Sequence, residues 1–204
     1  MISLIELLIL FLTAFGLNLI PFAGPSNLFI ASTAAVGIIN ADTTTLFLIG
    51  LIIAIAAALA KGIHYAVTFF VSKHLSQERQ ARLDAEAAKV RRWAFLLLFL
   101  AAASPIPDEP IVIPLGLMKY SIPKFFTAYF LGKLTITVAG AFLGNIVAGF
   151  FSVWLSPTAM VIISVVLTVV ITIILLKVDF GKLAQRLFKK KPAKPEKEKT
   201  KISN

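Results

Sequence analysis

The stretch SPIPDEPIVIP, residues 104 to 114, decides how the surrounding chain can fold. It lies between the apolar segments WAFLLLFLAAA and LGLMKY, so the region as a whole is apolar enough to enter a lipid bilayer. Each of its prolines removes a backbone hydrogen-bond donor and crowds the preceding turn, so a straight helix cannot continue through it. In hydrocarbon, such broken backbone is tolerated only inside protein or beside a water-filled cavity. We therefore expect residues 93 to 118 to form a re-entrant hairpin, in which two short helices meet at this Pro-rich tip; a kinked spanning helix is the alternative.

The composition is that of an integral membrane protein. Of 204 residues, 58% are hydrophobic and 15% are charged, and a soluble domain of this size could not bury so much apolar surface. The absence of cysteine excludes disulfides, thiol nucleophiles and Cys-based metal sites. A formal charge of +10 would suit nucleic-acid binding, but most basic residues lie between Lys73 and Arg92 or from Lys177 onward, beside apolar segments. That placement is typical of charges that set membrane topology, so we expect no nucleic-acid partner.

Further apolar segments predict the rest of the membrane domain. Residues 46 to 71, 125 to 155 and 160 to 176 are each expected to span the bilayer, because about 20 apolar residues suffice to cross it. Residues 2 to 39 are interrupted by NLIPFAGPSN, and we expect a first re-entrant hairpin there with its tip at residues 20 to 27. For this region a full span stays an alternative.

The basic residues favour a hairpin over a plain crossing at residues 93 to 118. With a hairpin, Lys119 and Lys124 lie on the same side as the basic segment from Lys73 to Arg92, and two further crossings return the tail to that side. The positive-inside rule makes this side the cytoplasm. We therefore expect an integral, multi-pass protein of the cell membrane with an extracytoplasmic N-terminus and a cytoplasmic C-terminus.

The two broken regions also belong to a repeat. In each copy a Pro-rich tip, beginning at Pro25 or Pro105, leads through an apolar limb and a polar connection into a spanning helix. Since the hairpins enter from opposite sides on the expected topology, the repeat is inverted, and such repeats place the working site where the broken elements meet. The expected fold is an all-α polytopic membrane protein with two opposed re-entrant hairpins and about three full transmembrane helices. The expected segments are a membrane domain (1–178) made of a first repeat (1–71), a cytoplasmic linker helix (72–92), a second repeat (93–155) and a final transmembrane helix (156–178), followed by a basic cytoplasmic tail (179–204).

Over residues 15 to 155 the chain resembles the DedA, or VTT (SNARE-associated Golgi protein), superfamily. The resemblance rests on the paired Pro-rich tips, on PIPDEP in the second tip and on PLGLMKYSIPKFFTAYFLGK at its end. It implies a transporter, flippase or scramblase of lipids, acting on polyprenyl phosphate carriers in bacteria and phospholipids in eukaryotes, with bacterial members linked to the proton-motive force. Asp108 and Glu109 match the acidic position of the family tip, and Gly132-Lys133 resembles its Gly-Arg pair. Unlike bacterial members, this chain has no carboxylate in the first tip and no basic residue in the second, so it resembles a divergent branch.

Five ionisable side chains are candidate proton-coupling or substrate-binding residues. Asp108 and Glu109 lie in the second tip, and ionisable groups inside a membrane usually mark a substrate path or proton relay. Neighbouring carboxylates in a low-dielectric cavity repel each other and lose hydration, which favours protonation near physiological pH; the alternative is a solvated helix cap. Lys61 and His64 share a helix face, and Lys133 holds a comparable place in the second half. Lys61 could pair with the carboxylates or contact a lipid phosphate; the alternative for Lys61 is a purely structural ion pair. The alternative for His64 is an interhelical hydrogen bond.

The tips themselves are expected to form a polar pocket at mid-depth. The tip residues are Pro21, Gly24, Pro25, Ser26, Asn27, Pro105, Pro107 and Pro110. Ser26 and Asn27 could hydrogen-bond substrate oxygens or cap the helix that follows them. The sequence has no metal-ligand spacing, Gly-rich phosphate loop or nucleophile–His–acid set, so we expect no metal, no cofactor and no enzyme activity.

These features together predict movement of a phospholipid or lipid-linked anion between leaflets. The carboxylates would change protonation to alternate headgroup binding and release, while Lys61 and Lys133 would neutralise headgroup charge. The expected partners are membrane lipids, including polyprenyl-phosphate-like ones, and an anionic lipid surface that attracts the basic tail; glycine-lined helices would also allow a homodimer. A proton-coupled transporter of a small soluble solute and a membrane-organising protein that transports nothing are the alternatives.

Overall fold

The described part of the chain consists of helices joined by short turns and loops. The structure, a computed structural model, describes residues 2–21, 25–38, 41–105 and 107–151, together with residues 156, 158–159, 162–163 and 166. These residues hold seven helices and no strand, which confirms the expected all-α fold class. The predicted final transmembrane helix (156–178) lies almost entirely outside the described residues, and the predicted basic tail (179–204) lies wholly outside them.

The helices follow one another in two similar series. The first series is α1 (Leu4–Leu19), α2 (Asn27–Val36) and α3 (Thr43–Ser72); α4 (Gln77–Val90) follows; the second series is α5 (Ala94–Ala102), α6 (Glu109–Leu117) and α7 (Ile122–Phe151). The long helices α3 and α7 have 30 residues each, and a rise of about 1.5 Å per residue makes each long enough to cross a hydrocarbon core of about 30 Å. Among the described residues, these are the two helices that are long and apolar enough to span a membrane.

Both Pro-rich stretches separate two short helices. α1 ends at Leu19 and α2 begins at Asn27, and α5 ends at Ala102 and α6 begins at Glu109. α5 and α6 have 9 residues each, which corresponds to only about 14 Å, so neither is long enough to cross a bilayer by itself. The predicted break of the helix is therefore present at both stretches.

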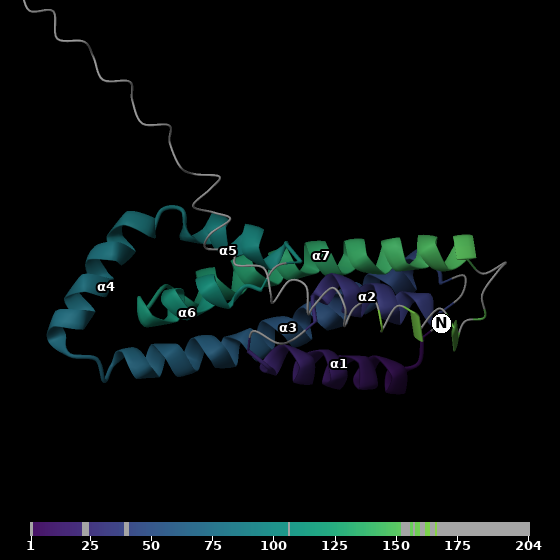
Figure 1. Cartoon of the computed structure of the whole chain (residues 1–204), viewed down its shortest axis with the longest axis horizontal. Coiled ribbons are helices and arrows are strands. Elements are labelled where there is room, and N and C mark those ends of the chain that lie inside the picture. The colour runs from purple at the N-terminus through teal and green to yellow at the C-terminus, as the bar shows by residue number, and fades with distance from the viewer. Residues whose placement is uncertain are drawn as a thin grey trace, which may run out of the picture.

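α3 and α7 pack against each other in opposite directions at the centre of the molecule (Figure 1). Gly50 in the first part of α3 faces Val138 of α7, where an added Cβ would lie 2.7 Å from the valine side chain. Gly62, further along α3, faces Phe126 near the start of α7, where a Cβ would lie 2.5 Å from the ring. The contacts follow opposite orders along the two helices, so the helices are antiparallel, and they come close because glycine has no side chain at either point.

The short helices pack in a pattern that treats the two series alike. α1 packs on α3 and α5 packs on α7, so each first short helix contacts the long helix of its own series. α2 packs on α7 and α6 packs on α3, so each second short helix contacts the long helix of the other series. Glycines of α7 permit the close approaches, since Gly140 faces the backbone of Leu28 in α2 and Gly132 faces the backbone of Phe99 in α5. If each helix of the first series is exchanged for its counterpart in the second (α1 for α5, α2 for α6, α3 for α7), the pattern of contacts stays the same.

Apolar side chains fill the interior and also cover much of the outside. Ile49, Ile53 and Leu98 have no exposed surface, as expected of a packed core. α1, in contrast, carries large apolar side chains that are 55–82% exposed: Leu4, Ile5, Leu8, Ile9 and Leu12. A contiguous apolar face of this kind is unusual on a soluble monomer and suits contact with lipid.

α4 lies at one end of the molecule, where α3 ends and α5 begins (Figure 1). It occupies most of the segment expected to form a linker helix, and its sequence, QERQARLDAEAAKV, is rich in charged and polar residues. Arg82 and Glu78 form an ion pair of 2.6 Å on its surface, with side chains 79% and 76% exposed. α4 is therefore a solvent-facing helix rather than part of the apolar bundle.

Candidate functional site

The break between α5 and α6 brings two carboxylates to the long helices. α6 begins at Glu109, and Pro110 lies in its first turn, where a backbone N–H has no intrahelical partner to lose. Asp108 directly precedes the helix, yet its side chain forms no capping hydrogen bond. A role for Asp108 as a side-chain helix cap is therefore wrong, and its carboxylate contacts α3 and α7 instead.

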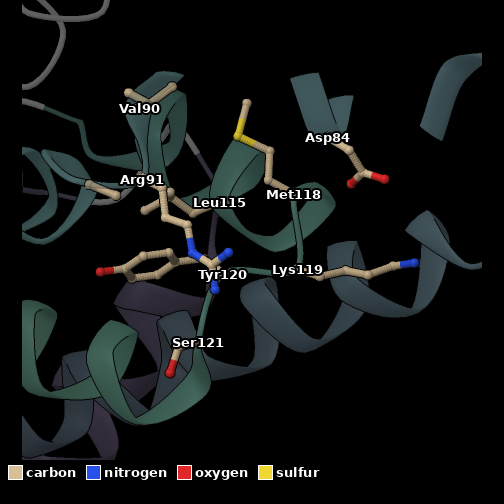
Figure 2. Close-up of a pocket in the computed structure, with 9 residues that line it drawn as sticks. Asp84, Val90, Arg91, Leu115, Met118, Lys119, Tyr120 and Ser121 are labelled. Atoms are coloured by element: carbon tan, nitrogen blue, oxygen red, sulfur yellow. The ribbon is translucent and has the colours of Figure 1, made fainter. Parts of the chain in front are cut away.

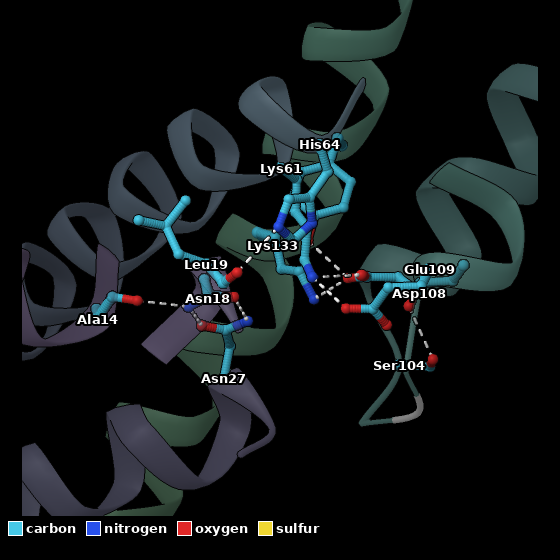
Figure 3. Close-up of polar contacts among 12 residues, drawn as sticks. Ala14, Asn18, Leu19, Asn27, Lys61, His64, Ser104, Asp108, Glu109 and Lys133 are labelled. Atoms are coloured by element: carbon cyan, nitrogen blue, oxygen red, sulfur yellow. Dashed lines mark hydrogen bonds and ion pairs between the residues drawn. The ribbon is translucent and has the colours of Figure 1, made fainter. Parts of the chain in front are cut away.

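Four charged side chains meet at this point and form what we call the charge quartet: Asp108, Glu109, Lys61 and Lys133 (Figure 3). Lys133 Nζ lies 2.7 Å from Asp108 Oδ2. Lys61 Nζ lies 3.5 Å from Asp108 Oδ1 and directly contacts Glu109 Oε1. Tyr129 Oη donates a hydrogen bond of 2.6 Å to Asp108 Oδ2. Lys61 thus links both carboxylates, while Lys133 and Tyr129 hold Asp108 from α7.

The charge quartet is shielded from the surroundings. Each of its four side chains is only 4–5% exposed. Burying an ionised group costs several kcal/mol unless the group is paired and hydrogen-bonded. Two ammonium groups and two carboxylates add up to no net formal charge, so the pairing meets this condition. The repulsion between the carboxylates expected from the sequence is opposed by a lysine beside each of them.

The antiparallel arrangement of α3 and α7 explains why the two lysines converge. Lys61 lies eleven residues before the end of α3 at Ser72, and Lys133 lies eleven residues after the start of α7 at Ile122. Because these two helix ends lie on the same side of the molecule, both lysines stand about 16 Å from that side, at 1.5 Å per residue. The second break delivers Asp108 and Glu109 to the same level.

The break between α1 and α2 approaches the same part of α3. His64 Nε2 lies 3.1 Å from the carbonyl oxygen of Leu19 at the end of α1, and His64 is one turn from Lys61 (Figure 3). Asn18 and Asn27 exchange two hydrogen bonds of 2.9 Å across this break, and both side chains are buried. His64 therefore hydrogen-bonds the end of α1 and is separate from the charge quartet. This is the interhelical hydrogen bond expected from the sequence as the alternative for His64.

The other predicted tip residues lie outside the charge quartet. Ser26 precedes α2 without capping it, and its buried hydroxyl has no hydrogen-bond partner among the described residues. Asn27 is occupied by Asn18. Gly24 lies outside the described residues, and the tip prolines Pro21, Pro25, Pro105 and Pro107 lie outside the helices. Pro114, at the end of the second Pro-rich stretch, lies inside α6, so the helix resumes before that stretch ends. Within the described part of the chain, no group of three histidine, aspartate or glutamate side chains is placed to hold a metal ion.

Aromatic side chains close one side of the charge quartet. Tyr129 stacks on Phe125 with ring centroids 5.9 Å apart, and Phe125 lies 4.4 Å from Tyr65. The Tyr65 hydroxyl in turn donates to the carbonyl oxygen of Tyr120 in the α6–α7 turn. Sequence reasoning did not single out Tyr129, although its position four residues before Lys133 places both side chains on one helix face.

Comparison with known proteins identifies one family. A family model of the VTT domain matches residues 20–146, which is more than half of the chain and includes the whole charge quartet and both breaks. No curated protein and no solved structure matches the chain.

Proposed function

The chain belongs to the VTT domain family, the DedA/VTT group of membrane-associated, transporter-like proteins, and on that premise we propose that it moves an anionic phospholipid or lipid-linked anion between the leaflets of a membrane. The observation that carries this proposal is the charge quartet. Ionisable groups deep in a membrane protein are costly and usually mark a substrate or proton pathway. Here four such groups lie between the two candidate spanning helices, where two broken helix pairs converge.

The arrangement of the helices supports two re-entrant hairpins. α5 and α6 are too short to cross a bilayer, and the two breaks approach the same part of α3 near Lys61 and His64. Interior breaks of this kind are tolerated where protein or a cavity covers the backbone. The packing is the same for both series of helices, which agrees with an inverted repeat whose tips meet at the working site. On this topology α4 faces the cytoplasm.

Charge balance suggests how substrate and protons are coupled. An anionic headgroup that entered the neutral quartet would leave an unbalanced negative charge in a buried place, which is costly. A proton on Glu109 would remove this charge and release Lys61 to bind the headgroup, while Lys133 and Tyr129 keep Asp108 in place. We therefore propose that one proton accompanies each negative charge of the headgroup, while the acyl chains stay in the bilayer.

A transporter of a small soluble anion is the second candidate. The observation that favours it is the enclosure of the quartet, whose side chains are only 4–5% exposed. A lipid needs a path that opens sideways to the bilayer, whereas a soluble anion needs only openings at the two ends. The charge argument is the same for both substrates, so the experiment must separate them.

The test is lipid movement in liposomes that contain the purified protein. Acyl-labelled fluorescent phosphatidylglycerol and phosphatidylcholine are reduced from outside by dithionite at several values between about pH 5.5 and 8. We expect wild type to move phosphatidylglycerol faster, and fastest at low pH. In Asp108→Asn/Glu109→Gln the two lysines stay unbalanced and hold the anion, so we expect exchange to fall at least about tenfold, equivalent to 1.4 kcal/mol, and to lose its pH dependence.

Glu78→Gln is the matched control, because Glu78 is an exposed acidic residue of α4 outside the quartet. It should behave as wild type. Equal activity in wild type and the double variant would refute a role for the quartet. If wild type moves neither lipid but acidifies liposomes when an anion gradient is applied, the soluble-anion candidate replaces the lipid one.

A further inference from the structure

A cavity separate from the charge quartet lies between α4, the start of α5 and the α6–α7 turn (Figure 2). Its volume is about 260 Å³, somewhat below the range of about 300–1,000 Å³ that is usual for drug-sized ligands. Its walls mix two cations, a carboxylate, a hydroxyl and apolar side chains: Arg91, Lys119, Asp84, Ser121, Tyr120, Leu115, Met118, Val90 and Ala94. A small polar group fits this space better than a whole lipid.

Lys119 is held in the cavity wall by an unusual backbone conformation. The end of α6 has two hydrogen bonds typical of a Schellman motif, from Tyr120 N to Leu115 O at 3.0 Å and from Lys119 N to Gly116 O at 3.1 Å. The residue after the cap in this motif is left-handed and is usually glycine. Here it is Lys119, with φ of 51°, and it is the only non-glycine residue with positive φ among the described residues.

A lysine in this position costs stability that a glycine would not. Left-handed backbone costs a residue with a Cβ about 1–2 kcal/mol. Such strained positions persist where the surrounding structure fixes them, and they cluster at functional sites. Lys119 and Arg91 both line the cavity, and in Figure 2 the Lys119 side chain extends to the side opposite the Arg91 guanidinium. Lys119 is therefore a candidate for a function that offsets the strain.

We propose that this cavity binds a phosphate anion, with Arg91 and Lys119 as its charged ligands. Guanidinium and ammonium groups are the usual protein partners of phosphate oxygens. Neither Arg91 nor Lys119 forms an ion pair with a carboxylate among the described residues. The carboxylate of Asp84 accepts a hydrogen bond of 3.0 Å from Gln80 on α4. Arg91, Lys119 and Asp84 are all exposed, so water screens each of these charges, and the two cations outnumber the one carboxylate. The walls therefore carry a net positive charge.

The surroundings of the cavity suit a headgroup at the membrane surface. Trp93, two residues after Arg91, is 52% exposed, and the Arg92 guanidinium lies 5.7 Å from its ring. Tryptophan and basic residues together are typical of the membrane–water interface. A lipid phosphate and a free phosphate ion offer the same chemistry to the two cations, and the experiment distinguishes them. The inference does not depend on lipid movement by the quartet, because its test measures binding at equilibrium.

Trp93 provides the reporter. The chain has two tryptophans, so Trp154→Phe leaves Trp93 alone, beside the cavity. The protein is placed in nanodiscs with increasing mole fractions of phosphatidic acid or phosphatidylcholine that carry brominated, quenching acyl chains. We expect half-maximal quenching at a several-fold lower fraction of phosphatidic acid than of phosphatidylcholine. Adding inorganic phosphate at constant ionic strength identifies the source: if the preference disappears, the site takes free phosphate, and if it persists, the site takes the lipid headgroup.

Two variants and a control decide the proposal. Arg91→Gln/Lys119→Gln should lose the preference for phosphatidic acid, while Arg79→Gln/Lys124→Gln removes the same charges outside the cavity wall and should keep it. Lys119→Gly relieves the backbone strain, so it should fold at least as well as wild type and still lose the preference. The proposal is overturned if wild type shows no preference, if Lys119→Gly retains it, or if the control loses as much as the cavity variant, since the effect would then be diffuse surface charge.

Discussion

Removing Lys61 should destabilise the protein far more than removing Lys61 and Glu109 together. Lys61 is the only ion-pair partner of Glu109 among the described residues, whereas Asp108 also has Lys133 at 2.7 Å and Tyr129 at 2.6 Å. Lys61→Met therefore leaves Glu109 buried without a counter-charge. Breaking a buried ion pair in this way costs about 3–5 kcal/mol, and Glu109→Met should cost a similar amount because it leaves Lys61 in excess.

The double variant Lys61→Met/Glu109→Met restores charge balance. It removes one whole pair and leaves Asp108 with Lys133, and replacing a buried pair by apolar side chains is often neutral or stabilising. We expect its free energy of unfolding to lie within about 1–2 kcal/mol of wild type, so the coupling energy between the two positions should exceed about 3 kcal/mol. The measurement is unfolding in mixed micelles, followed by circular dichroism as the fraction of denaturing detergent rises.

Arg82 and Glu78 supply the control cycle. They form a pair of 2.6 Å on α4, but their side chains are 79% and 76% exposed. Exposed pairs of this spacing are worth about 0.3–0.5 kcal/mol, because water and salt screen them. Two results would contradict this reasoning. In the first, the coupling energy between Lys61 and Glu109 is no larger than that between Arg82 and Glu78. In the second, the double variant loses as much unfolding free energy as the two single variants added together.

Four further variants test other parts of the structure. Gly132→Ala places a Cβ 2.5 Å from the Phe99 carbonyl oxygen, so thermal unfolding should show a loss of about 1–3 kcal/mol, whereas Gly16→Ala meets nothing within 4 Å and should be neutral or stabilising. Tyr129→Phe removes a hydrogen bond to a charged acceptor and should cost about 1.5–3 kcal/mol of unfolding free energy with helix content unchanged by circular dichroism. The hydrogen bond from Thr45 lowers the pKa of Asp42, which lies before α3. The stability that this hydrogen bond contributes is therefore present above the unfolded pKa of Asp42 and is lost as pH falls through its lower folded pKa. In Thr45→Val, NMR titration should show the pKa of Asp42 return toward its ordinary value.

The elements that local chemistry dictates could be predicted from the sequence. Clustered prolines disfavour a continuous helix, so the interruptions near Pro25 and Pro107 were visible without a structure, although α6 continues through Pro114. The long apolar segments that form α3 and most of α7 were visible for the same reason. The depth of Lys61 in its segment also led to the expectation that it could pair with the carboxylates, and the structure places it against both.

The features that depend on tertiary packing could not be predicted in this way. The sequence places two carboxylates side by side, but the balance of the quartet depends on how far Lys61 and Lys133 stand from their helix ends in an antiparallel pair. Tyr129 lies in a segment rich in aromatic residues, and nothing local distinguishes it from Phe125. The left-handed backbone at Lys119 runs against its residue type, so a prediction from propensity would have placed a glycine there.

The crossed packing of the second short helices has a consequence for synthesis. Ser32 of α2 donates a hydrogen bond of 2.8 Å to the carbonyl oxygen of Gly140 in α7, 108 residues later in the chain. At the usual rate of about 5–20 residues per second, α2 waits roughly 5–20 s for that partner. During this interval α1, α2 and α3 can pack against one another but not against α7, which has not been synthesised. α6, in contrast, is made after its partner α3. The first half of the chain therefore completes its structure only when the second half arrives, and a chain halted before α7 should be recognised by the cell as unfinished.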